Sequence, residues 1–307
     1  MKLAVPDLIS NSYFPAAAAV ELGMFKDEGL DVSLEMIFPV DKALEMMRDA
    51  EIDFVGGSAH STPHAFPEWR GAKLLASLAQ GMYWFLILRS DLGAKKGDVE
   101  AIKGLNIGAA PLVDLGLKQL LVASGIDEDR DGVRIAPVPG AVPGKAVNFG
   151  LTAAKALEEG TIDGFWANGM GAEVALRRGV GTLVLDVRRG DGPPGAFNYT
   201  MPALITSDAL IESDPGACAA AIRAIVKTHK ALKDDISLAT DVGRALFPAQ
   251  EAELIAGIIE RDLPFYDASI SPDFVAGMLQ FQKDVGLVSG TAAFDQVVAT
   301  QFSEYWT

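Results

Sequence analysis

Residues 50–64, Ala-Glu-Ile-Asp-Phe-Val-Gly-Gly-Ser-Ala-His-Ser-Thr-Pro-His, contain the pattern from which the fold can be inferred. The largely apolar run 52–55 has the length of a short strand, and two glycines end it. Ser61, Thr62 and Pro63 are typical of a helix start, because a hydroxyl caps free N–H groups and proline fits the first turn. We therefore expect a strand, a glycine turn and a helix whose N–H groups suit a polar or anionic small molecule.

A similar unit occurs later, at residues 160–171, Gly-Thr-Ile-Asp-Gly-Phe-Trp-Ala-Asn-Gly-Met-Gly. Both units place Ile-Asp just before the expected strand. Both also follow a helical segment that begins Lys-Ala-Leu, at Lys42 and at Lys155. Two similar units predict two similar lobes, each of which contributes a loop to a shared cleft.

The order of the other expected elements predicts an α/β fold. Strands alternate with helical segments in two series, with strands expected at 3–5, 30–37, 52–55 and 73–78, then at 84–88, 105–109, 133–138, 162–166 and 182–187. The helices expected between them include 16–22, 113–123, 147–158 and 172–177. Such alternation implies parallel sheets covered on both faces. The remaining third of the chain is expected to be mostly helical, with Asp214-Pro215 as a start signal.

Two segments separate the series, and each predicts a crossing between lobes. The first is Gln80-Gly81-Met82-Tyr83. The second is the glycine- and proline-rich run 190–195, which leads into an extended stretch at 199–205. We expect the chain to leave the first lobe near residue 82 and to return near residue 199.

Composition limits the classes of function. The chain has 307 residues, 50% of them hydrophobic, which is enough for two lobes with real cores. Its net charge of −15 argues against nucleic acid or an anionic membrane surface as a partner. No apolar run approaches the ~20 residues that a membrane span needs. The single cysteine, Cys218, excludes an intramolecular disulfide and is expected to be a small buried residue.

Candidate binding residues follow from the rule that ligands bind beyond the carboxyl ends of the strands of an α/β sheet. The loops there offer hydroxyl, amide, imidazole and aromatic groups, and the predicted binding residues are Asn11, Ser12, Tyr13, Ser58, His60, Ser61, Trp84, Asp114, Trp166 and Asn168. Trp84 and Trp166 suit a planar ligand, although both are equally suited to a core. For Asp114, the alternative to ligand binding is a structural role as a solvated acid in the first turn of a helix.

Histidine motifs and catalytic motifs add little. His60 is the best candidate for a hydrogen bond or charge contact with a ligand, with a surface histidine as the alternative. His60 and His64 lie four residues apart, but no glutamate follows as in His-Glu-x-x-His, so no metal is expected. His229 falls on an apolar helix stripe and is expected to be hydrogen-bonded and partly buried. No nucleophile elbow, phosphate-binding loop or dinucleotide motif is present, so no catalytic residue or cofactor is predicted.

The run Gly23-Met24-Phe25-Lys26-Asp27-Glu28-Gly29-Leu30-Asp31-Val32 resembles the N-terminal signature of ABC-transporter substrate-binding proteins of the SsuA/THI5-like (NMT1) superfamily. Residues 52–57, 104–108 and 162–166 support the resemblance, and together these pieces cover about residues 1–200 in the expected order. The resemblance implies a type II periplasmic-binding-protein-like fold, with two α/β lobes joined by two crossover segments and a ligand cleft between them. Residues 1–82 plus 199–307 would form one lobe and residues 83–198 the other.

The resemblance implies a solute-binding receptor of an ABC-type importer, a monomer that closes on a sulfonate, aromatic acid or pyrimidine-like ligand and meets a permease. The pocket would draw on loops 10–13, 58–61, 111–114 and 166–168. No arginine lies in these loops, which favours a neutral or weakly anionic, aromatic ligand. The protein would be periplasmic if a leader was removed and cytoplasmic if Met1 is the native start.

Two other classes of function stay open at this point. One is a cytoplasmic enzyme on the same fold with His60 as acid or base. The related pyrimidine synthases carry a cysteine cluster, which Cys218 alone cannot supply. The other is a ligand-sensing regulatory module, although no DNA-binding segment is attached.

Overall fold

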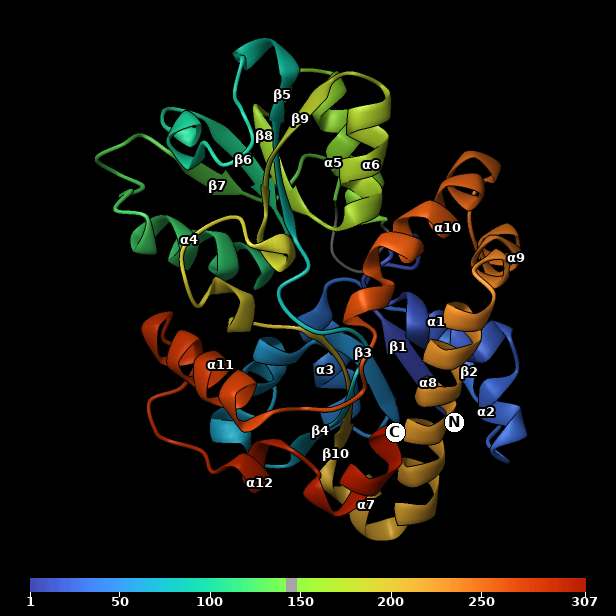
Figure 1. Ribbon diagram of the computed structural model, residues 1–307. Coiled ribbons are helices and arrows are strands. Elements are labelled where there is room, and N and C mark those ends of the chain that lie inside the picture. Colours follow the sequence, from blue (N-terminus) through green and yellow to red (C-terminus); the bar gives the residue numbers. More distant parts are fainter. Residues whose placement is uncertain (142–147) are drawn as a thin grey trace.

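The computed structural model describes residues 1–141 and 148–307 and contains two five-stranded sheets (Figure 1). The first sheet has the order β2-β1-β3-β10-β4, with β1 Lys2–Val5, β2 Ser33–Met36, β3 Phe54–Ser58, β4 Ala72–Ser77 and β10 Pro202–Ser207. The second has the order β7-β6-β8-β5-β9, with β5 Phe85–Arg89, β6 Asn106–Ala109, β7 Arg134–Ala136, β8 Gly164–Ala167 and β9 Gly181–Asp186.

Helices cover both sheets. The first sheet is flanked by α1 Phe14–Glu21, α2 Met24–Asp27, α3 Val40–Arg48, α7 Asp208–Ser213 and α8 Pro215–Asp234. The second carries α4 Val113–Ala123, α5 Phe149–Glu158 and α6 Gly169–Arg177. The C-terminal third adds α9 Ser237–Leu246, α10 Ala249–Asp262, α11 Pro272–Asp284 and α12 Phe294–Val297. Among the described helices, none is both long and apolar enough to cross a bilayer.

The expectation of purely parallel sheets is wrong for one strand in each. β1 pairs in parallel with β2 and β3, and β6 with β7 and β8. β10 is antiparallel to β3 and β4, and β5 is antiparallel to β8 and β9. Both strands enter their sheet directly from a crossing segment. They therefore start at the end of the sheet where the other strands finish, and must run in the opposite direction.

The prediction that an α-helix begins at Ser61 is also wrong. The chain forms only a short 3₁₀ helix, η1, at Ala59–His64, and no side chain caps its start. Pro63 lies inside this turn and has no N–H group, and Pro67 follows shortly after, so an α-helix cannot continue here. Because the turn is short, it carries little of the helix dipole that the sequence motif suggested.

Other local predictions are confirmed. In α3, Val40, Ala43, Leu44 and Met47 are all buried, as their helical spacing predicts. Helix α8 begins at Pro215, with the Asp214 side chain accepting a hydrogen bond from the backbone N–H of Ala217. The helix predicted at 147–158 is described from residue 149 onward, and its predicted start at residue 147 lies outside the described residues.

The two crossing segments lie side by side. The N–H of Leu78 donates to the carbonyl of Pro202 at 2.8 Å, and the N–H of Met82 donates to the carbonyl of Phe197 at 2.9 Å. Gly81 has φ +74°, and a Cβ there would lie 2.2 Å from the Phe197 ring, so only glycine fits the contact. The lobe boundaries 1–82 plus 199–307 and 83–198 stay a prediction.

Candidate functional site

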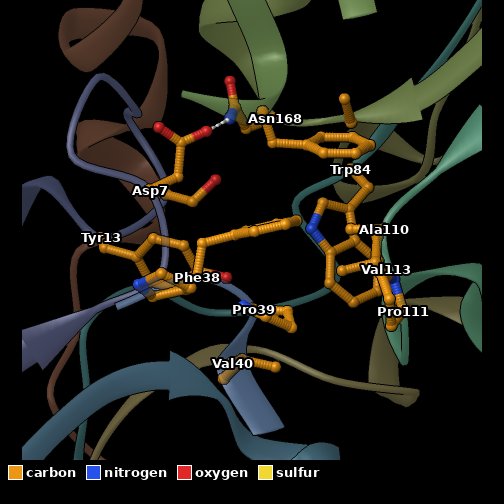
Figure 2. Close-up of a pocket in the computed structure, with 14 residues that line it drawn as sticks. Asp7, Tyr13, Phe38, Pro39, Val40, Trp84, Ala110, Pro111, Val113 and Asn168 are labelled. Carbon is orange, nitrogen blue, oxygen red and sulfur yellow. Dashed lines mark hydrogen bonds between the residues drawn. The ribbon is translucent and has the colours of Figure 1, made fainter. Parts of the chain in front are cut away.

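A cavity lies between loops that follow strands of both sheets (Figure 2). From the first sheet, residues 6, 7, 12 and 13 follow β1 and residues 38–40 follow β2. From the second sheet, residues 110, 111 and 113 follow β6, and residues 167 and 168 lie at the end of β8. Phe149 at the start of α5 and Trp84 at the first crossing complete the lining. About 440 Å³ is free of protein atoms, the open mouth included.

The walls of the cavity are mostly apolar, and four of the lining residues are aromatic. The Phe38 and Phe149 rings stack on each other, with their centroids 6.0 Å apart and an angle of 20° between their planes. Tyr13 and Trp84 form further parts of the wall, and Trp84 is backed edge-to-face by the buried Trp166 at 6.2 Å. Such walls favour a ligand that carries a ring or another apolar body.

Asp7 is the main residue of this cavity that sequence reasoning missed. Its side chain is 5% exposed, and its Oδ2 accepts hydrogen bonds from Asn168 Nδ2 at 2.9 Å and from the N–H of Gly150 at 3.3 Å. Burial raises the pKa of this carboxyl from 3.8 to about 7. The signal was present in Val5-Pro6-Asp7, where proline ends the first strand and an acid follows directly, but the nominated loop began three residues later.

Four predicted residues line the cavity: Ser12, Tyr13, Trp84 and Asn168. Asn168 has two roles, since its Oδ1 accepts from the N–H groups of Met170 and Gly171 and so caps α6, while its Nδ2 donates to Asp7. A Cβ at Gly150 would lie 2.7 Å from Asn168 Oδ1. The glycine therefore allows the asparagine to reach Asp7.

The other six predicted residues lie outside the lining in this conformation, and their role in binding stays a prediction. Asn11 Nδ2 donates to Asp262 Oδ2 at 2.6 Å. The Ser58 and Ser61 hydroxyl groups are hydrogen-bonded to each other at 2.6 Å, and Asp114 pairs with Lys118 at 2.7 Å. Trp166 packs behind Trp84, and His60 is buried.

His60 is completely buried and has a partner at each ring nitrogen. Nε2 lies 3.0 Å from the carbonyl of Leu112, and Nδ1 lies 2.9 Å from Thr200 Oγ1. Because a carbonyl only accepts, Nε2 carries the proton and Nδ1 accepts from the threonine hydroxyl. Burial lowers the pKa of this imidazole from 6.5 to about 4, so the ring is neutral. His60 thus links η1 to the loop before α4 and to the second crossing.

We expect His60→Phe to lower the free energy of unfolding by about 2 kcal/mol, because the Leu112 carbonyl and the Thr200 hydroxyl lose their buried partner. The phenyl ring keeps the packing against Trp84 and Phe281. Urea unfolding at neutral pH measures the change. His64→Gln, on the same turn but 38% exposed, is the control and should change stability by less than about 0.5 kcal/mol. Equal stability of the two variants would contradict the assignment.

A second polar cluster joins the C-terminal end of α10 to the segment after β9. Arg188 Nη1 lies 3.3 Å from Asp262 Oδ2, and both side chains are at most 3% exposed. Arg189 contacts the other carboxylate oxygen of Asp262 at 2.9 Å and also pairs with Asp186. Because Asn11 follows β1 and Arg188 follows β9, Asp262 connects loops that belong to different sheets.

No protein-family model matches this chain, and no curated protein matches its sequence. Solved structures do match in shape. A protein of Bordetella bronchiseptica RB50 aligns with TM-score 0.73 and 20% identity, over 99% of this chain and 94% of that one. The alkanesulfonate-binding protein SsuA of Xanthomonas axonopodis pv. citri, bound to MOPS, aligns with TM-score 0.72 and 10% identity, over 98% and 96%.

An enzyme is also among the structural neighbours. The desulfurization enzyme DszB aligns with TM-score 0.64 and 16% identity, over 99% of this chain and 97% of that one. All three alignments cover nearly the whole length of both chains. The predicted resemblance is thus confirmed in fold: the chain has the type II periplasmic-binding-protein-like fold of the SsuA-type substrate-binding proteins.

Proposed function

We propose that this protein is a solute-binding receptor of an ABC-type importer that closes around a small organic ligand and delivers it to a permease. The observation that carries the proposal is the cavity itself, whose walls come from loops of both sheets. A ligand held there contacts both halves at once, so its binding favours the closed arrangement. The likeness in fold to a sulfonate-binding protein supports the same function.

The lining favours an aromatic or otherwise apolar ligand over a strongly anionic one. Tyr13, Phe38, Trp84 and Phe149 give the wall four aromatic rings. Within the described residues, no lysine, arginine or histidine lines the cavity. A sulfonate would therefore have to rely on backbone N–H groups and hydroxyls, whereas a ring gains contact area from every side.

The first experiment is a thermal-shift screen with sulfonates, aromatic acids, pyrimidines, amides and amines, followed by calorimetry on compounds that raise the melting temperature. We expect Phe149→Ala to weaken binding of such a compound by about tenfold or more, because truncation removes one of the stacked rings. Phe294→Ala is the control, since Phe294 is half-buried in α12 and absent from the lining. Equal weakening by both variants would contradict binding in this cavity.

Transport is tested by deleting the gene and measuring uptake of the identified compound. Loss of uptake that is restored by the wild-type chain but not by Phe149→Ala supports the receptor. This role places the protein outside the cytoplasmic membrane, which cell fractionation checks. Uptake that is unaffected by the deletion would contradict the proposal.

The enzyme hypothesis has less support from the site. Both ring nitrogens of His60 are occupied by Leu112 and Thr200, and the ring does not line the cavity. Cys218 is fully buried in α8, and burial raises the pKa of its thiol to about 12, which leaves it a poor nucleophile. Chromatography of the ligand after prolonged incubation with the protein tests this hypothesis, and a product that His60→Phe fails to form would support it.

A further inference from the structure

Asp7 leaves one carboxylate oxygen without a partner inside the cavity. Oδ2 accepts from Asn168 and Gly150, but Oδ1 is buried and has no hydrogen-bond partner among the described residues. Ser12 Oγ, which lines the same cavity, is buried and unpartnered as well. Other buried side-chain atoms of the described residues also lack a partner, but these two belong to residues that line the cavity, so they indicate where a ligand donates hydrogen bonds.

The contacts of Asp7 within the described residues use only one of its two carboxylate oxygens. Holding Asn168 Nδ2 and the N–H of Gly150 requires only a neutral acceptor, which an asparagine oxygen supplies. A carboxylate adds the cost of burying a charge, and no cationic side chain contacts Asp7 in the described part of the chain. The first turn of α5 offsets part of this cost through the N–H of Gly150, and a ligand that donates to the free Oδ1 would offset more of it.

The surroundings of Asp7 suit a positively charged or N–H-bearing group. Tyr13, Phe38, Trp84 and Phe149 present aromatic rings to the cavity, and ring faces attract cations. Two helix starts at the cavity already have partners: the N–H of Gly150, in the first turn of α5, donates to Asp7 Oδ2, and Asn168 Oδ1 accepts from the N–H groups of Met170 and Gly171 in α6. An anionic ligand would also lie beside the Asp7 carboxylate.

We propose that the cavity binds a small organic cation with an aromatic ring, in which an ammonium or ring N–H group donates to Asp7 Oδ1 and the ring packs against Phe38 and Phe149. The inference rests on the proposed function as a receptor and names the class of its ligand. Ser12 Oγ accepts a second N–H of the same group. The carboxyl acts by selecting charge, while the aromatic walls supply most of the contact area.

Calorimetry at pH 8 with four matched probes tests the proposal: benzylamine, benzyl alcohol, benzoate and benzenesulfonate. We expect benzylamine to bind at least about tenfold more tightly than the alcohol, and the two anions to bind more weakly still. Asp7→Asn keeps the shape of the side chain and one oxygen that can accept from Asn168 and Gly150. It should weaken benzylamine binding by about 10–100-fold and change the affinity for benzyl alcohol by no more than about twofold. Asp273→Asn removes an exposed acid in α11 and is the control for net charge.

The pH dependence is a second readout that a structural role would not produce. The carboxyl must be ionised to bind a cation, and Asp7 titrates near pH 7 in the free protein. The titratable group that faces it is Tyr13, whose pKa is raised by burial and which stays neutral. We therefore expect benzylamine to bind about tenfold more weakly at pH 6 than at pH 8 and to release a proton on binding. Asp7→Asn should abolish both effects.

The outcomes separate this inference from the receptor function. Tighter binding of benzenesulfonate or benzoate than of benzylamine, with Asp7→Asn strengthening it, would overturn the cation proposal and leave the receptor intact. Failure of benzylamine to bind at millimolar concentration, while another class of compound in the thermal-shift screen binds, would overturn it in the same way. If the protein turned over its bound compound instead, the receptor function itself would be wrong.

Discussion

Asp262→Ala is expected to lower the free energy of unfolding by about 3–5 kcal/mol, because it leaves the Arg188 guanidinium buried without its anionic partner. Arg188 is 2% exposed at its side chain, and among the described residues its one acceptor besides Asp262 is the carbonyl of Gly81, at 3.3 Å. Tyr83 and Phe265 lie against its guanidinium and offer it no acceptor in place of the lost carboxylate. Urea unfolding at neutral pH measures the change.

Two comparisons show whether the effect comes from the buried pair. Arg188→Met combined with Asp262→Leu removes both charges and should recover most of the lost stability, because neither charge is then left alone. Asp241→Ala breaks an exposed pair with Arg244, in which the side chains are more than 60% exposed, and should change stability by less than about 1 kcal/mol. A loss below about 1 kcal/mol in Asp262→Ala would contradict the prediction.

The buried histidines are expected to make the protein sensitive to acid. His229 lies in α8, where its Nε2 is 2.8 Å from the carbonyl of Leu78 and its ring stacks on Tyr266. Burial lowers the pKa of His229 from 6.5 to about 4, as it does for His60. The unfolded chain binds a proton near pH 6.5, whereas the folded chain does so only near pH 4. Each histidine therefore removes about 3 kcal/mol of stability as the pH falls from 7 to 4.

Asp7 titrates with the opposite effect. Its pKa is about 7 in the folded chain and near 3.8 in the unfolded chain, so the folded state binds a proton first as the pH falls. Its contribution to stability rises through the same pH range and partly offsets the loss from the histidines. A variant that removes one histidine is therefore needed to see the effect of that histidine alone.

We expect His229→Gln to reduce the loss of stability between pH 7 and pH 4 by about 3 kcal/mol, since glutamine can donate to the Leu78 carbonyl but cannot be protonated in this range. Urea unfolding at several pH values gives the slope for each variant. Lys230→Gln, on the exposed side of the same helix, should keep the wild-type slope. The prediction fails if His229→Gln loses stability with acid as steeply as the wild type.

Local sequence patterns predicted the elements but not their directions. The alternation of strand and helix signals gave both sheets, and the apolar spacing in α3 and the Asp214-Pro215 start of α8 were also readable. The reversed direction of β5 and β10 was not, because an apolar run looks the same in either direction. The capping signals at Ser61 and Thr62 suggest a longer helix than η1, because they do not reflect the second proline at residue 67.

The site was predictable only in part, for a related reason. Ser12, Tyr13 and Asn168, which the strand-end rule selects, line the cavity, and their role in binding stays a prediction. The rule could not show that the ring nitrogens of His60 are occupied, since their partners Leu112 and Thr200 lie 52 and 140 residues away. It could not reveal Asp7 either, because the free oxygen of an acid is visible only when its neighbours in space are known.

The placement of β10 between β3 and β4 has a consequence for how the chain assembles as it leaves the ribosome. The sheet of β5–β9 uses one continuous stretch, residues 85–186, and can form as soon as that stretch has emerged. The other sheet must wait for Pro202–Ser207 while β3 and β4 present open edges, which invite pairing with other chains. The sheet that contains β1 is therefore the first to begin forming and the last to be completed. A nascent chain that stalls before residue 202 is the form most prone to aggregate.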